Sequence, residues 1–164
     1  MMTEQAKAGL DQLLSRALLS SVGTADDPAT SVHIVAGTPD FPETNVVVLT
    51  ISSYLVKLMV MIYFTPEQAT LDAVAESANL CCGVLNRDLG AFFPHIGMST
   101  PNILYKQSAL HVRSLPYSHL QHFSVDTASG RQIHASLCVF AYDVIDFTVE
   151  QDQQPEETGE LELF

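Results

Sequence analysis

The sequence predicts an α+β fold: an α/β sandwich in which a mostly antiparallel sheet carries an N-terminal helix and one long helix. Two segments place apolar residues at helical spacing, and several short runs are rich in β-branched and aromatic residues, as strands are. Along the chain a helix is followed by strands, a long helix and three more strands. Since strands and helices do not alternate throughout, a doubly wound parallel sheet is less favoured.

The composition is that of a single globular domain. A chain of 164 residues can bury one substantial core, and we assign residues 1–147 to one domain. The formal net charge of -12 argues against binding to nucleic acid or to anionic membrane surfaces. Cys81, Cys82 and Cys138 have apolar neighbours, which favours free thiols in a reducing cytoplasm. We therefore expect a cytoplasmic protein whose macromolecular partner, if it has one, is another protein.

The first half of the chain contains one helix and three strands by these criteria. Residues 3–20 have the spacing of an amphipathic helix, with Gly23 soon after as a stop signal. A strand is expected over Ser31–Gly37. The apolar run from Val46 to Phe64 approaches the length of a membrane span, but polar residues interrupt it, and a Ser-Ser break divides it into strands near 45–51 and 54–64.

A long helix follows these strands. Thr65 is expected as its N-cap, with Pro66 at the first helical position and Gln68 at the third, which is a capping-box arrangement. The helix is expected to run to about Leu89, before Gly90.

The second half of the domain is predicted to consist of strands. These are expected near 103–114, 117–126 and 131–142, the last two joined by a tight hairpin at Gly130. Residues 148–164 are acidic and carry few apolar side chains, so we predict a mobile, solubilising tail.

The long helix has two apolar sides and one narrow polar strip. One apolar side is expected to pack on the sheet, and a second flank, Ala73, Leu80 and Val84, is expected to be covered as well. The side facing the sheet consists of Leu71, Val74, Ala78, Cys81, Cys82, Leu85 and Leu89.

The polar strip contains Asp72, Glu76, Asn79, Gly83 and Asn86, at positions i, i+4, i+7, i+11 and i+14. Gly83 costs about 1 kcal/mol of helix propensity relative to alanine, which often marks a close approach by another group. The strip is therefore a candidate docking surface beside a reactive pair, although a solvated helix face explains the same spacing equally well.

This segment resembles the CheC/CheX/FliY family of chemotaxis phosphatases. The family motif is an acidic or small polar residue, then Glu, two further residues and Asn on a long helix, which Asp72, Glu76 and Asn79 match. The family also tends to have a small residue where Gly83 stands, and the segment Met98–Leu104, "MSTPNIL", is similar to the one that follows in the family. The single copy of the motif makes the chain most similar to CheX. Family members usually carry a further helix before the motif helix, which in this chain is either lost or merged into the start of the long helix.

The resemblance implies hydrolysis of the aspartyl phosphate on a CheY-like response regulator. Asn79 would position the attacking water, and Glu76 would accept a charge-assisted hydrogen bond from a lysine of the regulator. Asp72, Gly83 and Asn86 would line the docking surface. Magnesium would be bound by the regulator, with no cofactor on this chain. CheX-like proteins also imply a homodimer.

One alternative function remains open, and two other kinds of functional site are less favoured. A non-catalytic adaptor that binds a receiver domain, or another signalling partner, is the main alternative. Metal binding by His111, His119, His122 and His134, all on predicted strands, is less favoured because no pair has ligand spacing. A cysteine nucleophile lacks an identifiable activating charge near Cys81 or Cys82.

Overall fold

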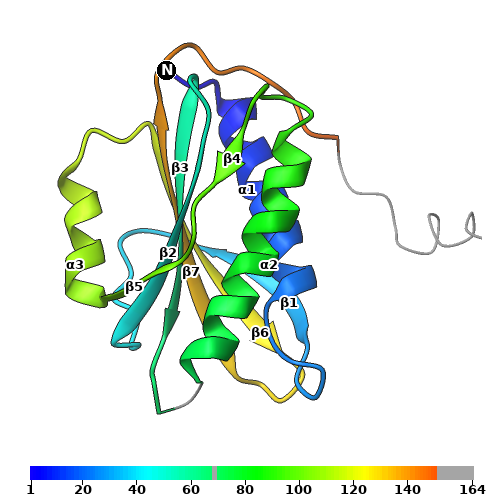
Figure 1. The fold of residues 1–164 in the computed structure, drawn as a ribbon, viewed down its shortest axis with the longest axis vertical. Helices are drawn as coiled ribbons and strands as arrows, with labels where there is room; N and C mark the ends of the chain where they lie inside the picture. The colour runs from blue at the N-terminus through cyan, green and yellow to red at the C-terminus, as the bar shows by residue number, and fades with distance from the viewer. Residues whose placement is uncertain (68–69, 151–164) are drawn as a thin grey trace, which may run out of the picture.

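The protein is described here from a computed structural model, which describes residues 1–67 and 70–150. Within those residues, seven strands form one sheet in the order β1-β6-β7-β3-β2-β4, with β5 also paired to β2. Every pairing between these strands is antiparallel. Two helices lie on one face of the sheet and a short helix on the other (Figure 1). The predicted α+β sandwich is confirmed.

The two larger helices enclose the main core. Helix α1 spans Glu4–Ser21 and is capped by Thr3, whose hydroxyl accepts from the Ala6 amide at 3.2 Å. Helix α2 spans Leu71–Leu89 and crosses the same face. The apolar sides of both helices pack on alternate residues of the strands, such as Leu58, Val60 and Ile62.

The strands of the first half lie close to their predicted positions. They are β1 (Ala29–Val35), β2 (Asn45–Ser52) and β3 (Val56–Phe64). The apolar run that approaches the length of a membrane span is thus an antiparallel β2–β3 pair. Both faces of this pair are covered, so its residues are buried almost continuously. No helix among the described residues is long and apolar enough to cross a membrane.

The second half differs from the prediction in one segment. The short strands β4 (Gly97–Met98) and β5 (Asn102–Tyr105) lie at the sheet edge beside β2, while β6 (His119–Thr127) and β7 (Gln132–Ala141) form the predicted hairpin. Gly130 has φ +90, as its turn requires.

The strand predicted over 103–114 is wrong beyond Tyr105. The chain there forms helix α3 (Lys106–Leu110) and the 3-10 turn η1 (His111–Ser114). Ala109 and Val112, three residues apart, turn one side of this segment onto a smaller core on the second face of the sheet, which favours helix over strand.

The predicted start of the long helix is also wrong. Thr65–Glu67 are not helical, Gln68 lies outside the described residues, and Thr70 caps the helix by accepting from the Ala73 amide at 3.2 Å. A second Thr thus supplies the cap, five residues after the predicted one.

Residues 142–150, which we call the strap, return from β7 over the end of the sheet to α1 (Figure 1). Ile145 forms an isolated parallel bridge with Met2, and Asp146 accepts from Thr3 Oγ1 at 2.8 Å and from Gln5 Nε2 at 2.7 Å. Phe147 stacks on Phe92. The predicted tail, 148–164, lies outside the described residues from 151 onward and stays a prediction there.

Candidate functional site

Helix α2 is fixed to the sheet by its apolar side, as the sequence predicts for most of that side. The buried residues are Val74, Ala78, Cys81, Cys82, Leu85 and Leu89. Leu71 and the predicted second flank depart from the expectation, since Leu71, Ala73 and Leu80 are exposed and Val84 is half-buried. Only part of that flank faces α1.

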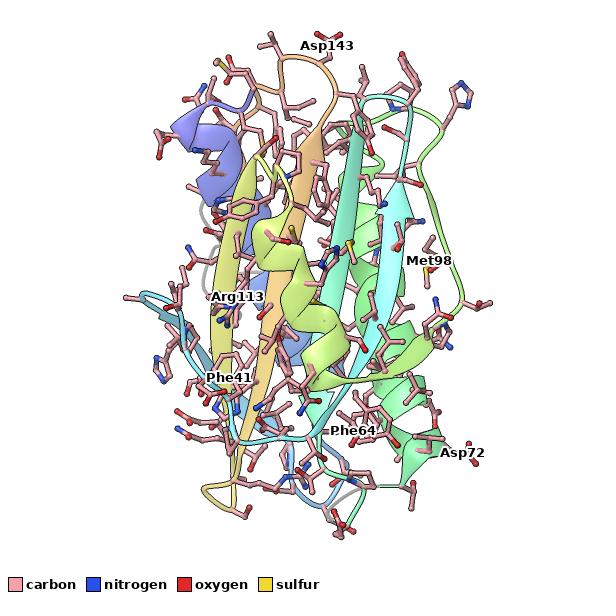
Figure 2. All side chains as sticks on the ribbon, turned by 90° about the vertical axis from the view of Figure 1, so that its left-hand side faces the viewer. Phe41, Phe64, Asp72, Met98, Arg113 and Asp143 are labelled. Carbon is pink, nitrogen blue, oxygen red and sulfur yellow. The ribbon has the colours of Figure 1, made fainter. Side chains whose placement is uncertain are left out.

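The predicted polar strip lies on the outer surface of α2. Asp72, Glu76, Asn79 and Gly83 are exposed, and Asn86 is half-buried. Figure 2 shows Asp72 at the beginning of the helix, pointing away from the molecule. The structure therefore presents the strip to solvent and leaves it accessible to a partner.

Glu76 and Asn79 have no polar partners among residues 1–67 and 70–150. Neither side chain makes a hydrogen bond or ion pair with another described residue. Their i, i+3 spacing brings their Cβ atoms to about 5–6 Å. A carboxylate acceptor and a carboxamide with both donors and an acceptor are thus held side by side on a rigid helix, and both are available to an outside group.

The other two members of the strip differ in their surroundings. No described atom lies within 4 Å of the place that a Cβ on Gly83 would occupy, so packing within the chain does not require glycine there. Asn86 Oδ1 is buried without a hydrogen-bond partner among the described residues. Asn86 is therefore less available for docking than the exposed members.

The segment similar to the family pattern, Met98–Leu104, lies along the edge of the sheet next to α2. Met98 pairs with Ile51, and Ser99 exchanges hydrogen bonds with Thr50, whose amide donates to Ser99 Oγ at 3.0 Å. Strand β4 contacts α2. This segment fixes the edge strand beside the helix.

The cysteines lack the environment of a nucleophile. All three are buried, and burial raises the pKa of Cys82 to about 12 and that of Cys138 to about 11. Burial, followed by the neighbouring Cys82 thiol, also raises the pKa of Cys81. Thiolate formation is thus disfavoured at each position.

Two of the four candidate histidines are each held by a carboxylate. His119 Nε2 lies 2.8 Å from Asp11 Oδ1, and His134 Nδ1 lies 2.8 Å from Glu43 Oε2. His111 is in the 3-10 turn and not on a strand. No group of three or more metal-ligating side chains occurs in the described parts of the chain.

A hydrogen-bonded cluster on the second face of the sheet was not predicted. His122 Nδ1 lies 2.7 Å from Ser136 Oγ, which lies 3.0 Å from Tyr63 Oη. His122 and Ser136 are paired across β6 and β7, and Tyr63 comes from the neighbouring strand β3. All three are buried, and the Phe41 ring contacts the rings of Tyr63 and His122. The sequence signals were Tyr63 and Ser136, which place hydroxyl groups within two largely apolar strands, β3 and β7.

A groove between α1 and α2 was also not predicted from the sequence. Its lining includes Arg16 and Ser20 from α1, and Leu80, Val84 and Arg87 from α2. Asp88 also lines the groove, so its two arginines leave a formal charge of about +1 in a chain whose net charge is -12. No pattern within either helix indicates that the two would meet.

Comparison with known proteins finds similar structures but no match among protein-family models or curated proteins. No protein-family model matches the chain, and no curated protein matches it. CheX from the CheX-CheY-BeF3-Mg2+ complex of Borrelia burgdorferi matches with a TM-score of 0.54 at 13% identity, covering 81% of this chain and 96% of that one.

Two further chemotaxis proteins are similar to the same extent. The CheX of Desulfovibrio desulfuricans gives a TM-score of 0.52 at 12% identity over 82% of this chain and 98% of that chain. The CheX of Vibrio vulnificus gives 0.51 at 13% identity over 82% and 98%. At such identities, the likeness is one of fold.

Proposed function

We propose, from the premise that this chain has the fold of the CheX chemotaxis proteins, that it accelerates hydrolysis of the aspartyl phosphate on a CheY-like response regulator. One observation carries the proposal: Glu76 and Asn79 stand exposed on the outward strip of α2, and neither has a hydrogen-bond or ion-pair partner in the part of the chain that the structure describes. The structural relative from Borrelia burgdorferi is a CheX in complex with CheY, which supports a receiver domain as the partner.

The chemistry requires a water held in line with the bond from phosphorus to the leaving carboxylate. Positioning and charge management supply most of the catalysis in phosphoryl transfer. Asn79 can hold the water because its carboxamide accepts one hydrogen bond and donates others without becoming charged. No metal on this chain is needed for that role.

Glu76 would dock the regulator. Its carboxylate accepts a charge-assisted hydrogen bond from a lysine of the receiver, which fixes the orientation of the two proteins and brings Asn79 to the phosphoryl group. Asp72 and Gly83 border the same surface, where Asp72 adds negative charge and Gly83 permits close approach. Magnesium belongs to the receiver in this scheme.

The test follows the decay of a phosphorylated CheY-like receiver in the presence of Mg2+, with and without this protein. We expect Asn79→Ala to reduce the acceleration at least about tenfold, which corresponds to about 1.4 kcal/mol of transition-state stabilisation. Glu76→Ala and Glu76→Lys should reduce it similarly, since each weakens docking. Gln107→Ala removes an exposed carboxamide on α3, on the other face of the sheet, and is the matched control.

Circular dichroism and the free energy of unfolding should be nearly unchanged in every variant, because these side chains are exposed and make no hydrogen bond or ion pair with other described residues. Full activity of both the Asn79 and Glu76 variants would show that the site is elsewhere. The alternative function is a non-catalytic adaptor. It predicts that the wild-type protein binds the receiver but leaves its phosphate decay unchanged or slower.

A further inference from the structure

The groove between α1 and α2 combines positive charge with exposed apolar surface. Arg16 and Arg87 line it from opposite helices, together with Ser20, Leu80, Val84 and Asp88. Leu80 is 55% exposed, and the Arg87 side chain is 74% exposed although Asp88 lies within 3.5 Å of it. These features suit a partner segment that carries both carboxylates and apolar side chains.

The strap leads directly to this groove. Asp146 is bound by Thr3 and Gln5, Val149 lies against Gly9, and the backbone oxygen of Glu150 accepts from Gln12 Nε2 at 2.9 Å. Successive strap residues thus contact successive turns of α1. Gln12, Arg16 and Ser20 follow at i, i+4 and i+8, on one side of that helix.

The distances make the groove reachable by the next residues of the chain. Arg16 is about 6 Å beyond Gln12 along the helix axis, and Ser20 about 12 Å. An extended residue spans about 3.3 Å, so two to four residues cover that path. Fourteen residues, 151–164, follow Glu150.

The composition of 151–164 complements the groove. The segment contains five acidic residues and no Lys or Arg, and "LELF" at 161–164 alternates apolar and acidic side chains. A segment joined to the same chain acts at an effective concentration in the millimolar range, so even a weak site would be occupied.

We propose that the α1–α2 groove is a docking site for the acidic segment 151–164 of the same chain. The carboxylates of the segment pair with Arg16 and Arg87, and its leucines cover Leu80 and Val84. Leu80 directly follows Asn79 in the sequence, so the docked segment flanks the exposed strip. If the proposed function holds, the segment competes with the receiver domain and lowers phosphatase activity.

Docking is measured on the full chain without reference to activity. A nitroxide is attached to Leu161→Cys, and paramagnetic broadening of backbone amides is recorded by NMR. Cys81, Cys82 and Cys138 are buried with raised pKa values, so the introduced thiol reacts selectively. We expect the Leu80, Val84 and Arg87 amides to lose at least about half their intensity, while the Gln107 and Ser108 amides of α3, on the opposite face of the sheet, keep theirs.

Two variants and a salt titration decide the outcome. Arg87→Glu should restore the signal intensities of the groove amides. Arg131→Glu, the same charge change on the β6–β7 hairpin, should leave them reduced. About 1 M NaCl, which shortens the Debye length to about 3 Å, should weaken the effect. Equal broadening at the groove and at α3, or none at either, would overturn the docking.

The regulatory consequence has a separate readout. Replacing Glu156, Glu157, Glu160 and Glu162 with Gln should raise the dephosphorylation rate at least about twofold at low salt. If the dephosphorylation rate is unchanged while the groove amides are broadened, the segment docks in the groove but does not compete with the receiver domain. If the groove amides are broadened but the wild-type protein has no phosphatase activity, the proposed function is overturned and the docking site is retained.

Discussion

The buried His122 shows how a single side chain ties the stability of this fold to pH. Burial, followed by the positive charge of Arg113, lowers its pKa from 6.5 to about 4. The imidazole is therefore neutral in the native state at neutral pH, where it is hydrogen-bonded to Ser136. Between about pH 6.5 and pH 4, this histidine is protonated in the unfolded chain but stays neutral in the folded chain.

The sign of the pH effect follows from that difference. The free energy of unfolding should fall as the pH drops from about 6.5 to about 4, by at most about 3 kcal/mol from this residue. His122→Asn keeps a polar atom near the position of Nδ1 and does not titrate, so its stability should depend less on pH over that window. Urea unfolding at steps from pH 7 to pH 4.5 measures this. Parallel curves for both proteins would show that His122 does not titrate with folding.

At the same scale, spacing in the sequence locates Glu76 and Asn79 correctly on an exposed strip. Spacing cannot distinguish a reactive pair from a solvated one, because both place polar residues on the outer face of a helix. The reaction comes from the resemblance. The His122–Ser136–Tyr63 cluster could not be predicted because it depends on the pairing of β6, β7 and β3, which no local pattern specifies.

At the scale of elements, periodicity in the sequence predicts the strands and the two larger helices well. It does not predict the elements whose type or boundary is set by tertiary contacts. Helix α3 forms because Ala109 and Val112 are covered by the second face of the sheet, and because the Lys106 ammonium donates to the Phe41 carbonyl. The helix start at Leu71 shows a related limit. The local motif at Thr65, with Pro66 and Gln68, favoured a start five residues too early, whereas Thr70 caps the helix without a capping box.

The contact between α1 and the strap gives an element-scale prediction from a matched pair of glycines. A Cβ on Gly9 would lie 2.9 Å from Val149 Cγ2 and 3.1 Å from Phe147 Cε2, whereas one on Gly83 meets nothing within 4 Å. Alanine gains about 1 kcal/mol of helix propensity over glycine. We expect Gly83→Ala to raise the free energy of unfolding by about that amount.

Gly9→Ala should gain less or lose stability, because the strap must move away. Hydrogen exchange at the Ile145 amide, which donates to the Met1 carbonyl at 2.8 Å, should become faster in this variant and stay unchanged in Gly83→Ala. Equal stabilisation by both substitutions, with no change in exchange, would show that the strap does not press on Gly9.

At the scale of the whole molecule, the class of fold follows from the order of elements, but the order of strands in the sheet does not. Strand β3 lies between β2 and β7, which is far along the chain, and β1 pairs with β6. Such pairings are set by the summed packing of both faces. The same arrangement leaves β1 at one edge of the sheet and β4 with β5 at the other.

The homodimer stays a prediction, and the β5 edge is where we expect it. All four residues of β5 are exposed, including Ile103, Leu104 and Tyr105, and unpaired edge strands recruit other chains. Sedimentation should give a species of twice 17.9 kDa, about 36 kDa. Tyr105→Glu should shift it to the monomer, whereas Tyr142→Glu on the strap should not. A wild-type monomer at all concentrations would refute the dimer.

The strap also bears on how the domain folds. Its contacts with Met2, Thr3 and Gln5 join positions more than 140 residues apart in the chain. Closing so long a loop carries a larger entropy cost than pairing neighbouring strands, so we expect these contacts to form after the sheet and the helices have assembled. Interactions made late slow unfolding and leave the folding rate almost unchanged. The strap therefore acts as a kinetic latch, which governs how long the native state persists more than how quickly it is reached.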